Sequence, residues 1–256
     1  MLGRRSDRGA DGGAVREAIR RDGRGDEMIG VFAMAAVLAA MVLLMAGALR
    51  RTRDTYEAQA RRAAERGWTY GRGESPGTGY SVEGRVGSVS WRLEAGRSGK
   101  GAGGARWVAR ELGSEGAVVE VMDRRGAALI KSPLLHKVAE WMVPFLPSND
   151  QGVESFRALM ERSVEVETGD PVFDAAYAVF ATDAGPARKL MDAGVRQAML
   201  GWTGERRLGT GGAALSVTWS PEGLSLDWPG TLADPEAMAR FIEIGELLGR
   251  AAEERF

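Results

Sequence analysis

Carboxylates are the residues best placed to do chemistry here, because the chain has no cysteine and a single histidine. Carboxylates in a dense group can act as general acids and bases or bind hard cations. Their spacing here does not match the D-x-[DN]-x-[DN]-G pattern of an EF-hand loop, and the simpler interpretation is an acidic strand edge that resists aggregation. The densest group comprises Glu161, Glu165, Glu167, Asp170 and Asp174.

Other catalytic and metal-binding chemistry finds little support in the residue types. The absence of cysteine excludes disulfides, thiolate metal sites and a cysteine nucleophile. His136 lies beside Lys137 in a predicted helix, where a solvated position is expected, and no GxSxG elbow accompanies any serine. We therefore predict no catalytic residue, no cofactor and no metal ligand, and a protein that is not an enzyme.

The glycine-rich stretch EAGRSGKGAGGARW, residues 94–107, raises the question of phosphate binding. A Walker A loop requires G-x-x-x-x-G-K-[ST], but Gly99-Lys100 is followed by glycine and preceded five positions earlier by Glu94. A phosphate cradle also needs a following helix, whereas ARWVAREL alternates like a strand. The stretch is therefore predicted to be a mobile hairpin connection.

Composition excludes one further class of partner. The chain has 256 residues, of which 44% are hydrophobic and 27% charged, a balance typical of a globular protein. The formal net charge of −1 provides no overall positive field, so no nucleic-acid partner is expected.

Residues 28–49 form an uncharged apolar run of 22 residues, which as a helix would extend about 33 Å and match a bilayer core. An A-x-A pattern at 46–48 offers cleavage as an alternative, but the run is too long for a typical signal core. Arg50, Arg51 and Arg53 follow directly, so we predict a retained single-pass anchor in the inner (plasma) membrane with the bulk of the chain cytoplasmic; a periplasmic placement stays open.

The segments around this anchor define the predicted domain organisation. Residues 1–27 are polar and rich in Gly and Arg, and are expected to be disordered. Residues 50–67 predict a solvated helical stalk whose apolar stripe is mostly alanine, ending at Gly67. Residues 68–256 predict a soluble α+β domain with an antiparallel sheet and two or three packing helices, which a polar loop at 148–152 would split into two subdomains.

Hydrophobic periodicity places the elements of this domain. Residues 68–123 predict a meander of four or five strands, and residues 164–167 and 177–182 predict two more. Residues 133–146 predict an amphipathic helix that packs on the core or lies on the bilayer with Trp141 at headgroup depth. Further predictions are one helix over 184–202, a hairpin over 215–228 and a closing helix capped by Asp234; Trp141, Arg50, Arg51 and Arg53 are the candidate membrane-surface contacts.

The second half of the chain resembles a family of membrane-anchored bacterial domains of unknown function. That family has a Phe-Asp pair before an aromatic strand, an acidic turn and an Ala-Arg-x-Leu helix start. The resemblance implies an anchored α+β domain and carries no catalytic residues. The matching positions are Phe173, Asp174, Tyr177, Val179, Asp183, Ala187, Arg188 and Leu190.

Three functional hypotheses follow. The first is a non-enzymatic, membrane-anchored binding or scaffolding protein, whose partners are the lipid bilayer and another protein. The second is a lipid or small-ligand binding module in which Trp91, Trp107 and Trp219 line an apolar cavity. The third is an enzyme that uses carboxylates alone.

Overall fold

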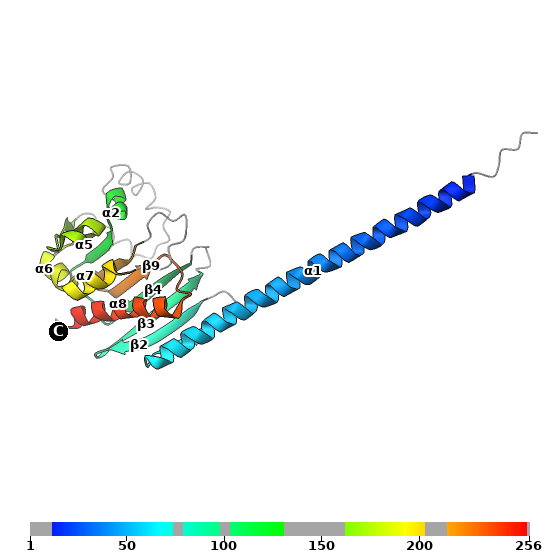
Figure 1. Ribbon diagram of the computed structural model, residues 1–256. Helices are drawn as coiled ribbons and strands as arrows, with labels where there is room; N and C mark the ends of the chain where they lie inside the picture. The colour runs from blue at the N-terminus through cyan, green and yellow to red at the C-terminus, as the bar shows by residue number, and fades with distance from the viewer. Residues whose placement is uncertain (1–11, 74–78, 98–102, 131–161, 203–213, 255–256) are drawn as a thin grey trace, which may run out of the picture. The chain divides into compact units, whose positions relative to one another are not determined.

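The computed structural model divides into two compact units, Met1–Asp54 and Thr55–Phe256 (Figure 1). The residues that the structure describes are 12–73, 79–97, 103–130, 162–202 and 214–254.

Helix α1 (Gly12–Glu65) is continuous and contributes residues to both units. It includes positions 12–27, where the sequence predicts no regular structure. Arg50, Arg51 and Arg53 are solvent-exposed on it. Nine of the eleven exposed large apolar side chains among the described residues lie on this helix, which indicates that its surface there is suited to an apolar environment. They are Met34, Val37, Leu38, Met41, Val42, Leu43, Leu44, Met45 and Leu49.

Within the described part of the chain, no helix combines the length and the apolar character needed to cross a membrane. The transmembrane span predicted at residues 28–49 is therefore not confirmed and stays a prediction.

The last part of α1, from Thr55 to Glu65, is packed into the second unit and is not the solvated stalk that the sequence predicts. Gln59 and Ala63 are almost fully buried. The Gln59 amide nitrogen donates to the Leu232 carbonyl at 2.6 Å and to the Ala233 carbonyl at 3.2 Å, while its oxygen accepts from the Tyr70 hydroxyl at 3.2 Å. One buried amide therefore joins this helix end to β1 and to the loop before the last helix.

The second unit is built on one nine-stranded sheet with the order β1-β2-β3-β4-β9-β8-β5-β7-β6, in which every neighbouring pair is antiparallel. The predicted split at 148–152 lies outside the described residues, but strands from both sides of it share this sheet. The strands are β1 (Thr69–Arg72), β2 (Tyr80–Val86), β3 (Val89–Arg97), β4 (Gly103–Ala109), β5 (Val119–Asp123), β6 (Val164–Glu165), β7 (Tyr177–Ala181), β8 (Ser216–Ser220) and β9 (Gly223–Trp228).

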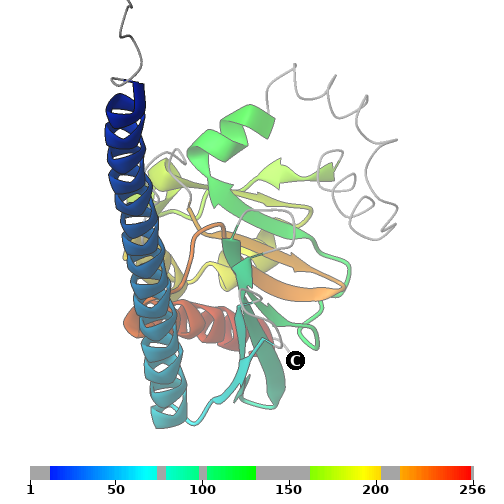
Figure 2. The same cartoon turned by 90° about the vertical axis from the view of Figure 1, so that its right-hand side faces the viewer.

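One face of the sheet, called the core face here, is apolar and covered by helices (Figure 2). Strand side chains alternate between faces, so Trp107 and Leu226 point to this side and are fully buried. Gly245 of α8 lets the helix approach the Trp107 ring, since a Cβ there would lie 2.5 Å from a ring carbon. The helices that contribute buried residues to it are the end of α1, through Ala63, and α5 (Pro171–Ala176), α6 (Ala184–Leu190), α7 (Ala193–Leu200) and α8 (Pro235–Glu253).

The opposite face, called the outer face here, carries the alternate side chains. At one end, α2 (Arg124–Ile130) and strands β5 and β7 form a small apolar cluster of Val118, Ala127, Ala178 and Phe180. Across β2, β3, β4, β9 and β8 this face is polar among the described residues. An antiparallel sheet tolerates such a division, because its two faces can meet different environments.

The α+β class and the antiparallel sheet are confirmed, as is the hairpin over 215–228. Of the strands predicted over residues 68–123, β1 to β4 form a meander, whereas β5 pairs with β7 and β8 instead of β4. Asp234 caps α8 as predicted, since its carboxylate accepts from the Ala237 amide at 2.9 Å. The described residues contain more packing helices than the two or three predicted.

Several local predictions are wrong. The helix predicted over 184–202 is two helices, because Asp192 caps a new helix by accepting from the Val195 amide at 2.8 Å. In the strand predicted over 164–167, alternation would turn Val164 and Val166 inward. Val166 is buried, but Val164 is 59% exposed, because β6 is a two-residue edge strand. The helix predicted over 133–146, with His136 and Trp141, lies outside the described residues.

Candidate functional site

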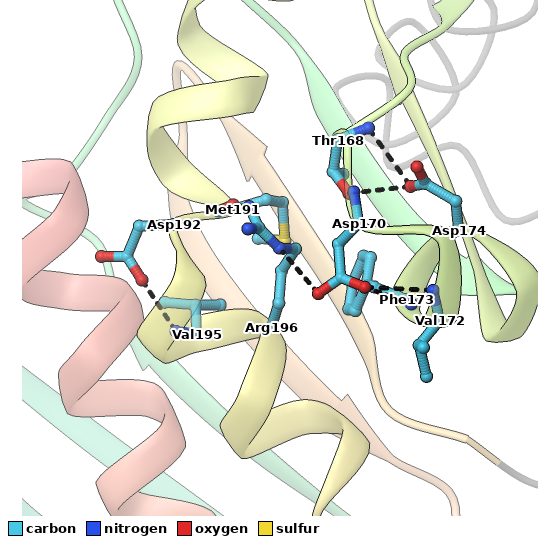
Figure 3. Close-up of polar contacts among 9 residues, drawn as sticks. All are labelled: Thr168, Asp170, Val172, Phe173, Asp174, Met191, Asp192, Val195 and Arg196. Carbon is cyan, nitrogen blue, oxygen red and sulfur yellow. Dashed lines mark hydrogen bonds and ion pairs between the residues drawn. The ribbon is translucent and has the colours of Figure 1, made fainter.

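Two members of the carboxylate group predicted from sequence, Asp170 and Asp174, lie around the start of α5 and bind backbone amides (Figure 3). Asp170 is the N-cap of α5 and accepts from the Val172 amide at 3.0 Å and the Phe173 amide at 3.2 Å. Asp174 accepts from the Thr168 amide at 3.2 Å and hydroxyl at 2.8 Å. These carboxylates satisfy donors that would otherwise be orphaned at a helix start and a turn.

Arg196 connects this turn to α7. Its guanidinium donates to the Met191 carbonyl at 2.6 Å and lies 3.5 Å from an Asp170 carboxylate oxygen. The pKa of Asp170 is held below its usual value, mainly by the hydrogen bond from the Phe173 amide. The Val172 amide and the charge of Arg196 lower this pKa further. Asp170 is therefore ionised at neutral pH and is not suited to proton transfer there.

The remaining acidic members do not converge on a common point. Glu165 pairs with Arg124, whose Nε donates to the Asp174 carbonyl at 2.6 Å, and Glu167 is exposed. Glu161 lies outside the described residues. Among the residues that the structure describes, no group of three or more potential ligands could hold a metal ion. The group is thus a network of caps and ion pairs that orders the connection into β7.

The positions of the family resemblance have structural roles in the same region. Phe173 is fully buried and stacks on Tyr177 with ring centroids 5.0 Å apart. Asp183 caps α6 through the Gly185 amide at 2.9 Å, and Ala187 and Leu190 are buried in the core. These contacts explain the residue types without assigning them chemistry.

The three tryptophans predicted to line one apolar cavity do not share a cavity in the described part of the chain. Trp91, Trp107 and Trp219 are nearly fully buried members of the packed core, and Trp91 lies 6.1 Å from Trp107 between ring centroids. Trp219 also donates its indole N–H to the Leu112 carbonyl at 2.8 Å. The lipid-pocket hypothesis therefore loses the residues on which it was based.

The glycine-rich stretch connects β3 to β4 as predicted, with Arg97 opposite Gly103 in the register. Because a strand follows it, the arrangement of a phosphate-binding loop before a helix is absent from this described region. The predicted mobility concerns residues 98–102, which lie outside the described part.

A hollow of about 1500 Å³, called the charged hollow here, lies along β2, β3 and β4 of the outer face, and its lining also includes Trp91, and Glu246 of α8, from the core-face side. Five arginines and five glutamates are among its lining residues, so their formal charges cancel. Ion pairs cross this face: Arg92 lies 3.2 Å from Glu83 and 3.1 Å from Glu94, all more than half exposed. Such exposed pairs contribute little stability, which leaves them available for exchange with a partner.

A half-buried polar group adjoins the charged hollow across β4, β9, β8 and β5. Arg106, which lines the hollow, lies 3.5 Å from the Asp227 carboxylate, and the Ser225 hydroxyl donates to Asp227 at 3.2 Å. The Thr218 hydroxyl donates to Glu120 at 2.8 Å. The register places Glu120 opposite Thr218, and Thr218 opposite Ser225, so these side chains form one transverse row.

Burial changes the acid–base properties of both carboxyls in this row. Desolvation raises the pKa of Glu120 to about 7, with the charge of Asp227 adding to the rise and the Thr218 hydrogen bond opposing it. Burial also raises the pKa of Asp227, against the lowering effects of Arg106 and Ser225. Because its pKa is about 7, the carboxyl of Glu120 in this row can both donate and accept a proton at neutral pH.

Sequence reasoning did not single out Glu120 or Asp227, because each is the polar residue of an alternating strand and would be expected in water. The available signal was a glutamate in the mostly apolar stretch AVVEVM, which indicates a central strand. Its burial depends on Thr218, which lies 98 positions away in the chain.

Comparison with known proteins adds little. No protein-family model matches this chain, and no curated protein matches it. Among solved structures, the chain is similar to a crystal structure of the mycobacterial trehalose monomycolate transport factor A, TtfA, with a TM-score of 0.38 and 13% sequence identity. The match covers 78% of this chain and 96% of that chain. A likeness at this level supports no argument about fold or function.

Proposed function

We propose that the second unit is a non-enzymatic binding module that docks a polypeptide partner of mixed charge on its outer face. The charged hollow carries this proposal, because its lining contains as many arginines as glutamates. A nucleic acid or an anionic lipid surface would meet as many repelling carboxylates as attracting guanidiniums. A polypeptide with both signs of charge can instead replace the exposed intramolecular pairs one by one.

We further propose that residues 28–49 attach this module to the inner membrane, with the module facing the cytoplasm. The support is the set of exposed apolar side chains between Met34 and Leu49, followed by the exposed Arg50, Arg51 and Arg53. A reporter fused after Phe256 tests the orientation: activity of a periplasm-specific reporter would reverse the proposed placement.

Photocrosslinking in cells tests the docking proposal. A photoreactive residue in place of Arg92 should form an adduct with one discrete protein, whereas the same residue at Arg240, exposed on the helical side of the sheet, should not. Charge reversal of both Glu83 and Glu94 should reduce the adduct at position 92. Equal labelling at positions 92 and 240, or none at 92, would contradict the proposal.

The transverse row supports a second candidate function, a carboxylate-dependent enzyme, because a carboxyl with a pKa of about 7 suits general acid–base catalysis. The test is turnover of chromogenic esters and glycosides by the purified full chain. Activity lost in both Glu120→Gln and Asp227→Asn would favour this candidate, and equal activity in wild type and variants would eliminate it.

A further inference from the structure

Two tryptophans line the end of the charged hollow where α1 leads into β1. Trp68 and Trp91 meet edge to face there, with ring centroids 5.7 Å apart and an interplanar angle of 79°. Trp68 is half-buried, whereas Trp91 is only 3% exposed. A Cβ at Gly84 would come within 2.3 Å of the Trp91 ring and 3.0 Å of the Trp68 ring. Glycine at this position therefore lets both rings lie against β2.

The edge of the sheet accounts for the access of these rings to the hollow. The register of β1 and β2 ends at the pair Thr69 and Glu83. Beyond this pair, the described residues supply no strand beside residues 84–86 on that side. The hollow therefore reaches around the edge of the sheet, and its lining combines outer-face residues with Trp68, Trp91 and Glu246.

Glu246 of α8 brings a half-buried carboxylate to the two indoles. Burial raises its pKa, while the N–H groups of Trp68 and Trp91 favour its charged form. The N–H of Trp91 does so from a distance, because it is buried and has no partner in hydrogen-bonding geometry among the described residues. A carboxylate has about four acceptor positions, so the two indoles leave part of its capacity unused.

No cation of the described residues forms an ion pair with Glu246. Arg66, which also lines the hollow, lies 2.6 Å from Glu243 of the preceding turn. Arg250 lies on the following turn, where it is exposed and acts on Glu246 only through its charge. The group thus combines aromatic rings with a carboxylate that lacks a cationic partner, which is the chemistry that recognises a cation.

We propose that Trp68, Trp91 and Glu246, called the indole pocket here, bind the guanidinium of one arginine side chain of the docked polypeptide. This proposal rests on the function proposed above and names the residue by which the partner is held. Arginine fits better than lysine, because its planar group can lie against an indole ring and donate two parallel hydrogen bonds to a carboxylate.

Binding of a small arginine derivative provides the first test. The full chain, with ¹⁵N-labelled tryptophan and in detergent micelles, is titrated with N-acetylarginine amide and, separately, with its uncharged isostere N-acetylcitrulline amide. The indole signal of Trp68, assigned by its loss in Trp68→Phe, should respond to arginine at about tenfold lower concentration than to citrulline. Equal responses to the two compounds would overturn the proposal.

Glu246→Gln separates the charge from any structural role, because glutamine keeps an oxygen that can accept from the indoles. It should weaken arginine binding about tenfold and leave the urea unfolding midpoint close to that of wild type. The control Glu111→Gln removes an exposed carboxylate that lines the same hollow, and should change binding by less than about twofold. Equal weakening in both variants would assign the effect to the overall charge of the hollow and overturn the indole pocket.

Trp68→Phe tests the aromatic part independently of the carboxylate. Phenylalanine keeps a ring with a weaker attraction for cations, so arginine binding, followed at the remaining indole signals, should weaken by about threefold. Unchanged binding in this variant would overturn the proposed role of the rings.

Photocrosslinking in cells connects the indole pocket to docking. With the photoreactive residue at Arg92, the adduct should fall about tenfold in Glu246→Gln and stay within about twofold of wild type in Glu111→Gln. An undiminished adduct in Glu246→Gln would overturn the indole pocket and leave the docking proposal standing. Absence of the adduct in the wild type, with binding of N-acetylarginine amide intact, would overturn docking on the outer face and support the pocket as an arginine site.

Discussion

The two faces of the sheet differ in how their side chains are held: by close packing on the core face and by exposed ion pairs on the outer face. On the core face, large apolar side chains such as Trp107 and Phe241 are fully buried and hold each other in place by shape. On the outer face, charged side chains such as Arg92 and Glu94 remain more than half exposed and pair with each other. The packed core face should tolerate little change in side-chain volume, whereas the exposed outer face should tolerate substitution by other residue types. Stability should therefore depend on the core face, and recognition on the outer face.

The contact between Gly245 and Trp107 offers the largest expected effect. In Gly245→Ala the added methyl group would lie 2.5 to 2.7 Å from three carbons of a fully buried ring. Alanine normally stabilises a helix interior, but here overpacking should lower the free energy of unfolding by about 3 kcal/mol. Urea unfolding followed by tryptophan fluorescence measures it.

Gly126 in α2 provides the matched control, since a Cβ there meets its nearest neighbour at an ordinary 3.6 Å. Gly126→Ala should be neutral or slightly stabilising. A similar loss in both variants would show that the core face is not the more tightly packed of the two.

Gln59 should have the next largest effect, because its buried amide joins the end of α1 to β1 and to the loop before α8. In Gln59→Ala, the carbonyls of Leu232 and Ala233 and the hydroxyl of Tyr70 lose this partner, which should cost about 2 kcal/mol. The control Arg61→Ala changes an exposed residue on the same helix and should stay within about 0.5 kcal/mol of wild type. Equal unfolding midpoints for the two variants would restore the interpretation of residues 50–67 as a solvated stalk.

Local patterns predicted much of the core face and little of the polar contacts. Leu215, Val217 and Trp219 alternate along the chain, so the sequence displays their common face directly. Gln59 and Glu120 have no such signature, because the groups that bury them lie 173 and 98 positions away. The short helix α5 was missed for a related reason: its cap, Asp170, was interpreted as one member of an acidic group.

The acid–base behaviour of Glu120 gives an intermediate effect that is specific to the outer face. Its pKa is raised from 4.5 to about 7 on folding, so the native state binds a proton that the unfolded state has lost between these pH values. The stability due to this group is thus fully present below about pH 4.5 and is lost as pH rises through 7. Glu120→Gln should equal wild type near pH 4 and exceed it by about 2 kcal/mol at pH 8, less than the roughly 3 kcal/mol that the full shift would give, because the side chain is partly exposed.

Chemical denaturation at a series of pH values measures this difference. Glu94→Gln, an exposed carboxylate on the same face, serves as the matched control. If the gain at pH 8 were the same in both variants, the burial of Glu120 would not be its cause.

The break between α6 and α7 depends on Asp192, which has a smaller expected effect. Asp192→Ala removes the side chain that accepts from the Val195 amide at 2.8 Å, and should lower stability by about 1 kcal/mol. Asp192→Asn retains the accepting oxygen and should recover most of this loss. Hydrogen exchange at the Val195 amide reports the change locally, and unchanged protection in Asp192→Ala would contradict the capping role.

Arg92 should have the smallest effect on stability and so sharpens the contrast between the faces. Its two ion pairs, with Glu83 and Glu94, join side chains that are each more than half exposed. Water and salt screen such pairs, so Arg92→Ala should change the free energy of unfolding by less than about 0.5 kcal/mol. The same substitution should still weaken the adduct formed by a photoreactive residue at Arg85, which also lines the charged hollow, because the hollow loses a guanidinium. If Arg92→Ala lost as much stability as Gly245→Ala, both faces would stabilise the fold. That result would contradict the assignment of stability to the core face alone.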